Sequence, residues 1–201
     1  MKKIYAYYQS IPLSNQNEEF ACANWWKHSW EANGWQNTML NRSHAQASPL
    51  YNKLTQKLMN TAHGLPPELA TRFDWIIARY IRWCALHAAG GGWMSDYDVA
   101  NLGFTTNQAE AHENNATIQI NEDAPAYVFY ATQDHCANAI KKFIHDDLID
   151  EGKVLYEAHI LGLKSSLHES LPLLHHAKSS GEEKRSDVMA SLTTPQDEKP
   201  I

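Results

Sequence analysis

The distribution of apolar residues predicts four β-strands. Residues 3–8 combine Ile and Ala with three Tyr residues and are followed by a Ser-Ile-Pro turn signal. Residues 36–40 form a second, short candidate strand, and residues 93–99 form a third that contains two aspartates. Residues 126–131 are an uninterrupted apolar run, which is typical of a buried strand.

Four helices are predicted among these strands. Residues 15–34 begin with Asn and Glu at the spacing of a capping box and end on Gly, a common helix stop. Residues 66–89 begin with Pro-Pro-Glu and carry apolar side chains at helical spacing up to a run of three glycines. Residues 48–61 and 137–148 are the remaining candidates.

Strands that alternate with helices favour an α/β domain with a mostly parallel sheet flanked by helices. Trp26 and Trp30 share one face of the first predicted helix, so we expect both in the core. Trp93 is expected to be buried beside the strand that carries the aspartates.

Composition limits what such a domain can be. The chain has 201 residues, of which 43% are hydrophobic, so it has enough apolar material for a sizeable core. We expect one domain over residues 1–176 and a polar, mobile tail over residues 177–201. The net charge of −6 and the sequence pI near 6.0 argue against a nucleic-acid-binding protein, which normally has a basic excess.

Neither a signal peptide nor a membrane span is expected. The first apolar run is interrupted at Gln9, and no segment approaches the ~18–20 apolar residues of a transmembrane helix. Cys22, Cys84 and Cys136 are far apart and odd in number, which predicts buried thiols and not a disulfide framework. We therefore expect a soluble, cytoplasmic protein.

The segment of residues 79–98 carries the strongest chemical signal. A helix with Arg79 and Arg82 leads into the glycines, then into an apolar strand and finally to Asp96 and Asp98. Carboxylates two residues apart on a strand point to the same side, and at its carboxyl end both face the crevice where α/β proteins bind ligands. Mg²⁺ and Mn²⁺ favour carboxylate oxygens together with phosphate oxygens. A solvated pair of aspartates is the alternative interpretation of an isolated Asp-x-Asp.

The same segment contains a longer motif. It reads Arg82-x-x-Ala85-Leu86, followed by Gly91-Gly92-Trp93-Met94-Ser95-Asp96-Tyr97-Asp98. This motif resembles the DXD sugar-binding region of family 32-like glycosyltransferases, which also occurs in related glucosylating toxins. Weaker similarities at residues 4–12, 26–35 and 126–135 extend the resemblance over roughly residues 3–176.

The resemblance implies a GT-A fold, in which a Rossmann-type, mostly parallel sheet binds a nucleotide-diphosphate sugar with Mn²⁺ or Mg²⁺. By this analogy Asp96 contacts the ribose and the sugar, and Asp98, with Asp96 beside it, binds the metal on the diphosphate. Arg82 would lie near the donor sugar and phosphates. The family implies retention of anomeric configuration, but no catalytic nucleophile or base can be named.

Two positions depart from the family pattern. Arg79 stands where the family usually has an aspartate that binds sugar hydroxyls, and three glycines stand where the family has two. Both departures bear on the donor sugar and on activity. Because a planar guanidinium suits a diphosphate, Arg79 and Arg82 are both candidates for donor contact.

Further candidates lie at the two ends of the domain. Tyr8 and Gln9 follow the first strand, where GT-A proteins receive the nucleotide base. His175 and His176 precede Lys178, and many metal-dependent GT-A enzymes place a late histidine on the metal and a nearby lysine on the diphosphate. The pattern does not distinguish the two histidines, and an exposed polar end before the tail is an equal alternative.

Three functions are compatible with these patterns. The first is a glycosyltransferase that moves a sugar from a nucleotide-diphosphate donor to an unidentified hydroxyl acceptor. The second is an aspartyl-phosphate-type phosphatase with Asp96 as nucleophile, which the late position of the strand disfavours. The third is a non-catalytic nucleotide-sugar-binding protein, which Arg79 and the short chain keep open as an alternative. The sequence predicts no oligomeric state.

Overall fold

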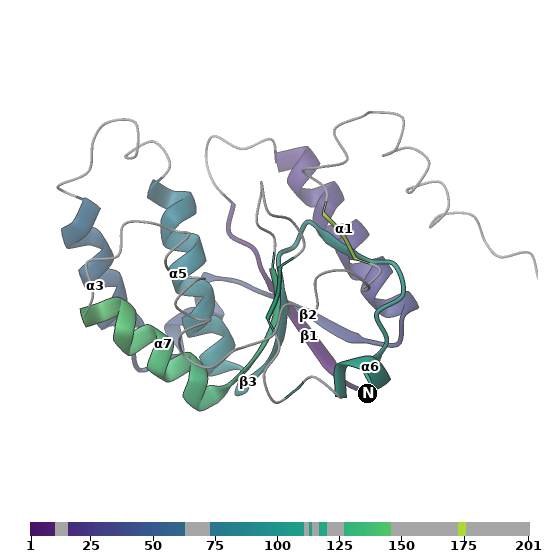
Figure 1. Cartoon of the computed structure of the whole chain (residues 1–201). Coiled ribbons are helices and arrows are strands. Elements are labelled where there is room, and N and C mark those ends of the chain that lie inside the picture. The colour runs from purple at the N-terminus through teal and green to yellow at the C-terminus, as the bar shows by residue number, and fades with distance from the viewer. Residues whose placement is uncertain are drawn as a thin grey trace, which may run out of the picture.

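A five-stranded sheet with helices on both faces forms the centre of the molecule (Figure 1). The computed structural model describes residues 1–10, 16–62, 73–110, 113, 117–119, 127–145 and 173–175. In spatial order the strands of this sheet are β2 (Gln36–Leu40), β1 (Lys3–Tyr7), β3 (Gly91–Ser95), β6 (Tyr127–Thr132) and β5 (Thr117–Gln119). A second, two-stranded sheet pairs β4 (Val99–Asn101) with β7 (Leu173–His175). The helices are α1 (Gln16–Ala32), α2 (Arg42–Gln46), α3 (Tyr51–Ala62), α5 (Phe73–Ala88), α6 (Thr106–Glu110) and α7 (Gln133–His145).

The order of the strands creates a topological switch point. β2, β1 and β3 are parallel neighbours, whereas β6 is antiparallel to both β3 and β5. The chain leaves β1 through α1 to reach β2 on one side, and then returns through α2, α3 and α5 to β3 on the other side. The predicted α/β class, with a mostly parallel sheet flanked by helices, is confirmed. The direction of β6 was not predicted, because a local apolar run carries no information about strand direction.

The alternation of side chains along β1 separates two hydrophobic layers. Ile4 and Ala6 pack into one cluster with tryptophans from α1 and with Trp93. Tyr5 and Tyr7 point to the opposite face and pack into a second cluster formed mainly by α3, α5 and α7. Figure 1 shows the same division, with α1 and α6 on one side of the sheet and α3, α5 and α7 on the other.

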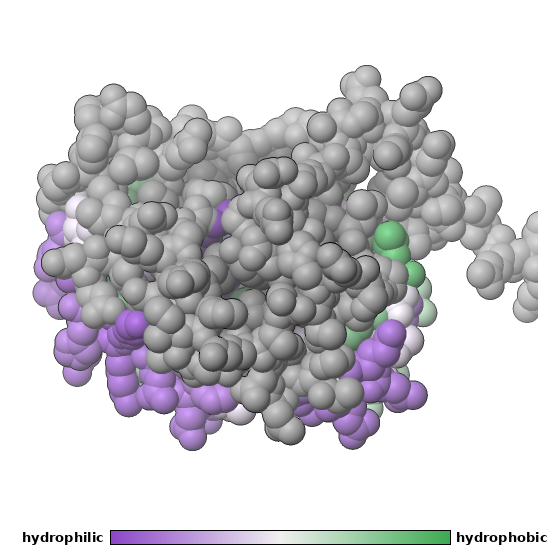
Figure 2. All heavy atoms as spheres, viewed as in Figure 1, coloured by the Kyte–Doolittle hydropathy of each residue, from purple (hydrophilic) through white to green (hydrophobic). Residues whose placement is uncertain are grey.

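The outer helices are amphipathic, as their apolar spacing requires. In α7 the buried residues Cys136, Ala139, Ile140 and Phe143 recur at helical spacing, while Asn138 and Lys141 between them are polar and exposed. Figure 2 shows this polar surface over α3 and α7 at the lower left of the molecule. Trp26, Trp30 and Trp93 are buried, which confirms their predicted place in the core.

Most predicted elements are present with shifted ends, and one prediction is wrong. The predicted strands at residues 3–8, 36–40 and 126–131 correspond to β1, β2 and β6. The predicted continuous strand at residues 93–99 is instead two strands, β3 and β4, separated by a turn at residues 96–98. The Val99 backbone N–H donates to the Asp96 carbonyl at 3.2 Å and closes this turn. Both aspartates therefore lie in a turn at the carboxyl end of β3, not within a strand. We call residues 96–98 the aspartate turn.

The glycine run has a backbone role at the other end of β3. Gly90, Gly91 and Gly92 all have positive φ angles, of 92°, 84° and 134°. A Cβ atom on Gly91 would lie 2.6 Å from the carbonyl oxygen of Ala131 and 2.6 Å from the backbone nitrogen of Gln133. The absence of a side chain at Gly91 thus allows β3 to lie close against the backbone at the β6–α7 junction.

The three cysteines are buried free thiols, as predicted. Burial raises the pKa of Cys84 to about 12, and burial likewise raises the pKa of Cys136 to about 12. Thiols with such pKa values remain protonated at neutral pH and are poor nucleophiles.

Several predictions lie outside the described residues. They concern the start of the first helix at Asn15, the start of the third at Pro66, and the tail at residues 177–201. Within the described part of the chain, no helix is long and apolar enough to cross a membrane.

Candidate functional site

The carboxyl ends of three parallel strands meet at one edge of the sheet. In the strand register Tyr7 lies opposite Leu40, and Ala6 lies opposite Ser95. The residues that follow β1 and β3, namely Tyr8 with Gln9 and the turn that starts at Asp96, therefore flank the switch point between these strands. Ligands of open α/β sheets bind in such a crevice, outside the carboxyl ends of the strands.

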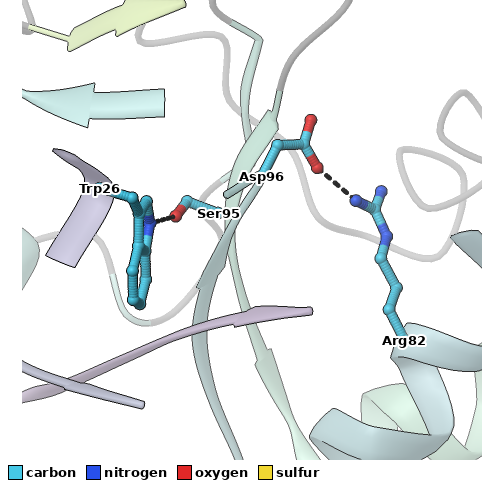
Figure 3. Close-up of polar contacts among 4 residues, drawn as sticks. All are labelled: Trp26, Arg82, Ser95 and Asp96. Carbon is cyan, nitrogen blue, oxygen red and sulfur yellow. Dashed lines mark hydrogen bonds and ion pairs between the residues drawn. The ribbon is translucent and has the colours of Figure 1, made fainter. Parts of the chain in front are cut away.

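Asp96 faces α5 because of its register position. Trp93 and Ser95 point toward α1, so Met94 and Asp96 point toward the opposite face, where α5 lies. Arg82 reaches this position from α5, and its Nη1 atom lies 2.5 Å from Oδ1 of Asp96 (Figure 3). The structure thus brings together two residues that are fourteen positions apart in the sequence and were both predicted to serve the donor.

Arg82 occupies an unusual environment for a charged side chain. Only 7% of the residue is exposed, and its guanidinium carbon lies 5.6 Å from the centre of the Phe129 ring. Among the described residues its Nε atom is buried without a hydrogen-bond partner. A buried guanidinium normally has all its N–H groups satisfied, so this atom leaves donor capacity beside the Asp96 carboxylate.

Tyr97 connects the turn to the end of β1. Its ring contacts the ring of Tyr8 edge to face, with 5.4 Å between the ring centres. Burial raises the pKa of Tyr97, and the nearby negative charges of Glu19 and Asp98 raise it further. Tyr97 therefore stays a neutral hydrogen-bonding group, while Asp98 and Glu19 supply negative charge next to it.

The two candidates at the end of β1 have partners of their own. The Tyr7 hydroxyl donates to Oε1 of Gln9 at 2.9 Å, and the Tyr8 hydroxyl donates to Oε2 of Glu19 at 2.9 Å. The second bond holds the chain after β1 against the start of α1. Tyr8 reaches the aspartate turn through Tyr97, whereas no contact of Gln9 with that turn is described.

Two further arginines lie near this edge. Arg79 is half-buried on α5, one helical turn before Arg82. Arg42 was not predicted as a site residue; it follows the end of β2, and its Nε atom donates to the Tyr51 hydroxyl at 2.8 Å. The signal that could have identified Arg42 is its position directly after a predicted parallel strand.

β7, near the C-terminal end of the chain, lies beside the residue that follows the aspartate turn. In the antiparallel pairing of β4 with β7, His175 lies opposite Val99, the residue that follows Asp98. The backbone of His175 is therefore next to the turn, although its side chain is not described. His176 and Lys178 lie outside the described residues.

The described donor set fits a hard divalent cation with few protein ligands. Among the described residues there is no group of three or more His, Cys, Asp or Glu side chains that could hold a metal. Mg²⁺ and Mn²⁺ commonly bind through one or two carboxylates and complete their shell with phosphate oxygens and water. Asp98 and Asp96 could hold such an ion together with a diphosphate.

Comparison of the chain with protein-family models, with curated proteins and with solved structures gives no significant match. The case for a function therefore depends on the geometry of the carboxyl edge and on the chemistry of its residues.

Proposed function

We propose that this protein is a metal-dependent glycosyltransferase with a GT-A-like fold that uses a nucleotide-diphosphate sugar. The observation that carries the proposal is the partly buried ion pair between Arg82 and Asp96 at the switch point between β1 and β3. It combines an anion-binding guanidinium with a carboxylate suited to hydroxyl groups, at the edge where α/β proteins bind nucleotides.

The proposed roles follow from position and charge. Asp96, fixed by Arg82, would accept hydrogen bonds from hydroxyl groups of the ribose and the sugar. Asp98 would ligate Mn²⁺ or Mg²⁺, with His175 or His176 as a further candidate ligand. When bound, the cation would neutralise the leaving diphosphate as a Lewis acid. Arg79 and Lys178 would add positive charge toward the phosphates.

The crevice at the end of β1 would receive the nucleoside. Tyr8 and Tyr97 present aromatic surface there, and Gln9 provides an amide next to it. The buried Arg82 holds positive charge in a region of low dielectric, where its interaction with a phosphate is stronger than in water. The arginines and a bound cation would supply the positive charge that a diphosphate requires, despite the net charge of −6 of the whole chain.

One observation also favours the phosphatase alternative. Asp96 lies at the carboxyl end of the central strand of the sheet, which is where an aspartyl nucleophile would be expected. However, Oδ1 of this carboxylate is already engaged by Arg82, which leaves it less accessible for attack on a phosphate. We therefore rank transfer from a nucleotide sugar above phosphate-ester hydrolysis.

An activity assay distinguishes these functions. The full chain is incubated with UDP-, GDP-, CDP- and ADP-sugars and, separately, with an aryl phosphate, each with and without Mn²⁺. We expect slow release of sugar from one donor class, only with Mn²⁺, and no hydrolysis of the aryl phosphate. Hydrolysis of the aryl phosphate that is lost in Asp96→Asn would instead establish the phosphatase. Donor binding without any turnover would indicate a non-catalytic protein.

A further inference from the structure

The inner face of α1 forms a row of hydrogen bonds to the segment Ser95–Phe104, which contains the aspartate turn. The indole N–H of Trp26 donates to Oγ of Ser95 at 2.6 Å, and that of Trp30 donates to the carbonyl of Val99 at 3.0 Å. The backbone N–H of Asn101 donates to the Ser29 hydroxyl oxygen at 3.0 Å. Further along the chain, the indole N–H of Trp35 donates to the carbonyl of Phe104 at 2.8 Å.

Two of these bonds bracket the aspartate turn. Ser95 directly precedes Asp96, and Val99 directly follows Asp98. Trp26 and Trp30 are four residues apart, so they lie one above the other on the same face of α1. One helix therefore holds both ends of the turn, and Figure 3 shows Trp26 bonded to Ser95 on the side of the strand opposite Arg82.

The two indoles have little freedom to move. Trp26 and Trp30 are 1% and 0% exposed, and the Trp30 ring packs edge to face against Trp35, with 5.3 Å between ring centres. On the strand side, Ser95 is itself fixed by pairing with Ala6 in β1 and with Val128 in β6. The hydrogen bonds thus join the buried face of α1 to Ser95 and Val99, the two residues that flank the turn.

We propose that Trp26 and Trp30 are positioning residues that hold the Asp96-Tyr97-Asp98 turn in one geometry and thereby set its affinity for a divalent cation with a diphosphate. The cation part of this inference rests on the proposed function. Residues that orient metal ligands without touching the metal commonly change its affinity when they are replaced.

The experiment compares three Trp→Phe variants of the full chain. Trp26→Phe and Trp30→Phe each remove one N–H donor at the turn and keep an aromatic ring in the core. Trp35→Phe is the matched control, because it removes the same kind of bond at Phe104, away from the aspartates. Ser95→Ala removes the acceptor of Trp26 with a smaller change of volume and provides a second variant should Trp26→Phe fold poorly.

Two readouts separate positioning from general stability. The first is hydrogen exchange of the Val99 amide, which closes the turn by donating to Asp96, measured without ligand. The second is the dissociation constant of Mn²⁺ with whichever of UDP, GDP, CDP or ADP stabilises the wild type. In Trp26→Phe and Trp30→Phe we expect faster exchange of the Val99 amide and roughly tenfold weaker Mn²⁺ binding. Trp35→Phe should lower Tm by a similar amount but change neither the exchange nor the binding.

Two results would count against the inference. One is a wild type that binds a diphosphate with Mn²⁺ while Trp26→Phe and Trp30→Phe bind it equally well. The other is Val99 exchange that changes no more in these variants than in Trp35→Phe. Failure of the wild type to bind any diphosphate would overturn the proposed function and the role in cation affinity, whereas the exchange comparison still decides whether the tryptophans hold the turn.

Discussion

Replacement of Gly91 by alanine is expected to remove a large part of the stability of the fold. The new Cβ atom would lie 2.6–2.7 Å from three backbone atoms of residues 131–133, which cannot move aside as a flexible side chain could. The φ angle of 84° adds the cost of a left-handed conformation, about 1–2 kcal/mol. We expect a total loss of about 4 kcal/mol or more, against the ~5–15 kcal/mol that typical domains have.

Gly90→Ala is the control for this prediction. Gly90 has a similar φ angle of 92°, but nothing lies within 4 Å of the position that a Cβ atom would take there. Gly90→Ala should therefore lower the free energy of unfolding only by the cost of the left-handed backbone conformation, about 1–2 kcal/mol. Urea unfolding of both variants measures the difference, and equal stabilities would show that β3 does not pack against the β6–α7 backbone as described.

The second large loss of stability is expected when the ion pair between Arg82 and Asp96 is broken by substitution of one partner. Arg82 is 7% exposed, whereas the Asp96 side chain retains 21% exposure. Asp96→Asn would leave a nearly buried guanidinium without its counter-charge, which costs about 3 kcal/mol in comparable pairs. Arg82→Met keeps the aliphatic stem and leaves a carboxylate that water can partly solvate, so we expect a smaller loss.

A double-mutant cycle tests this coupling. The double variant Arg82→Met/Asp96→Asn should be more stable than the sum of the single losses predicts, because it leaves no unpaired charge. Free energies of unfolding in urea for all four proteins give the coupling directly. Additive losses would mean that the two groups do not interact as an ion pair.

Local patterns were sufficient for the longer elements but not for the short ones or for the arrangement of the elements in space. Residues 3–8 identify β1 by their Ile and Tyr residues and the turn signal that follows, whereas residues 36–40 correspond to β2 although only Met39 and Leu40 are apolar. The helix at residues 42–46 was not predicted, since its N-cap Asn41 and the reciprocal bond with His44 give no apolar periodicity. Strands β4, β5 and β7 have three residues each, which is too short for a periodic pattern to identify.

The same limit explains the error at residues 93–99. Trp93 and Val99 are both typical of strands, and the intervening Asp-Tyr-Asp residues are compatible with a strand or a turn. β3 and β4 are separate strands because they pair with different, distant segments. β3 pairs with β1 and β6, whereas β4 pairs with β7 near the other end of the chain. Such pairings cannot be inferred from one segment alone.

The candidate site was partly predictable for a physical reason. The order of an arginine-bearing helix, a glycine run and a strand that ends on aspartates singled out this segment, and its resemblance to the DXD region of glycosyltransferases implied donor roles for Arg82 and Asp96. Their ion pair and the burial of Arg82 required the packing of α5 on the sheet. Trp26 and Trp30 were predicted as core residues, which is correct, but the hydrogen bonds of their indoles depend on a partner segment 69 residues away.

The most direct test of the proposed donor site is a thermal-shift measurement on the full chain with UDP, GDP, CDP and ADP, with and without Mn²⁺. A ligand at a hundred times its dissociation constant stabilises a protein by about 2.7 kcal/mol, which for a chain of this size raises Tm by roughly 5 °C or more. We predict such a shift for one diphosphate only when Mn²⁺ is present, and its loss in Asp98→Asn. If no diphosphate raises Tm under any metal condition, the protein has no such donor site.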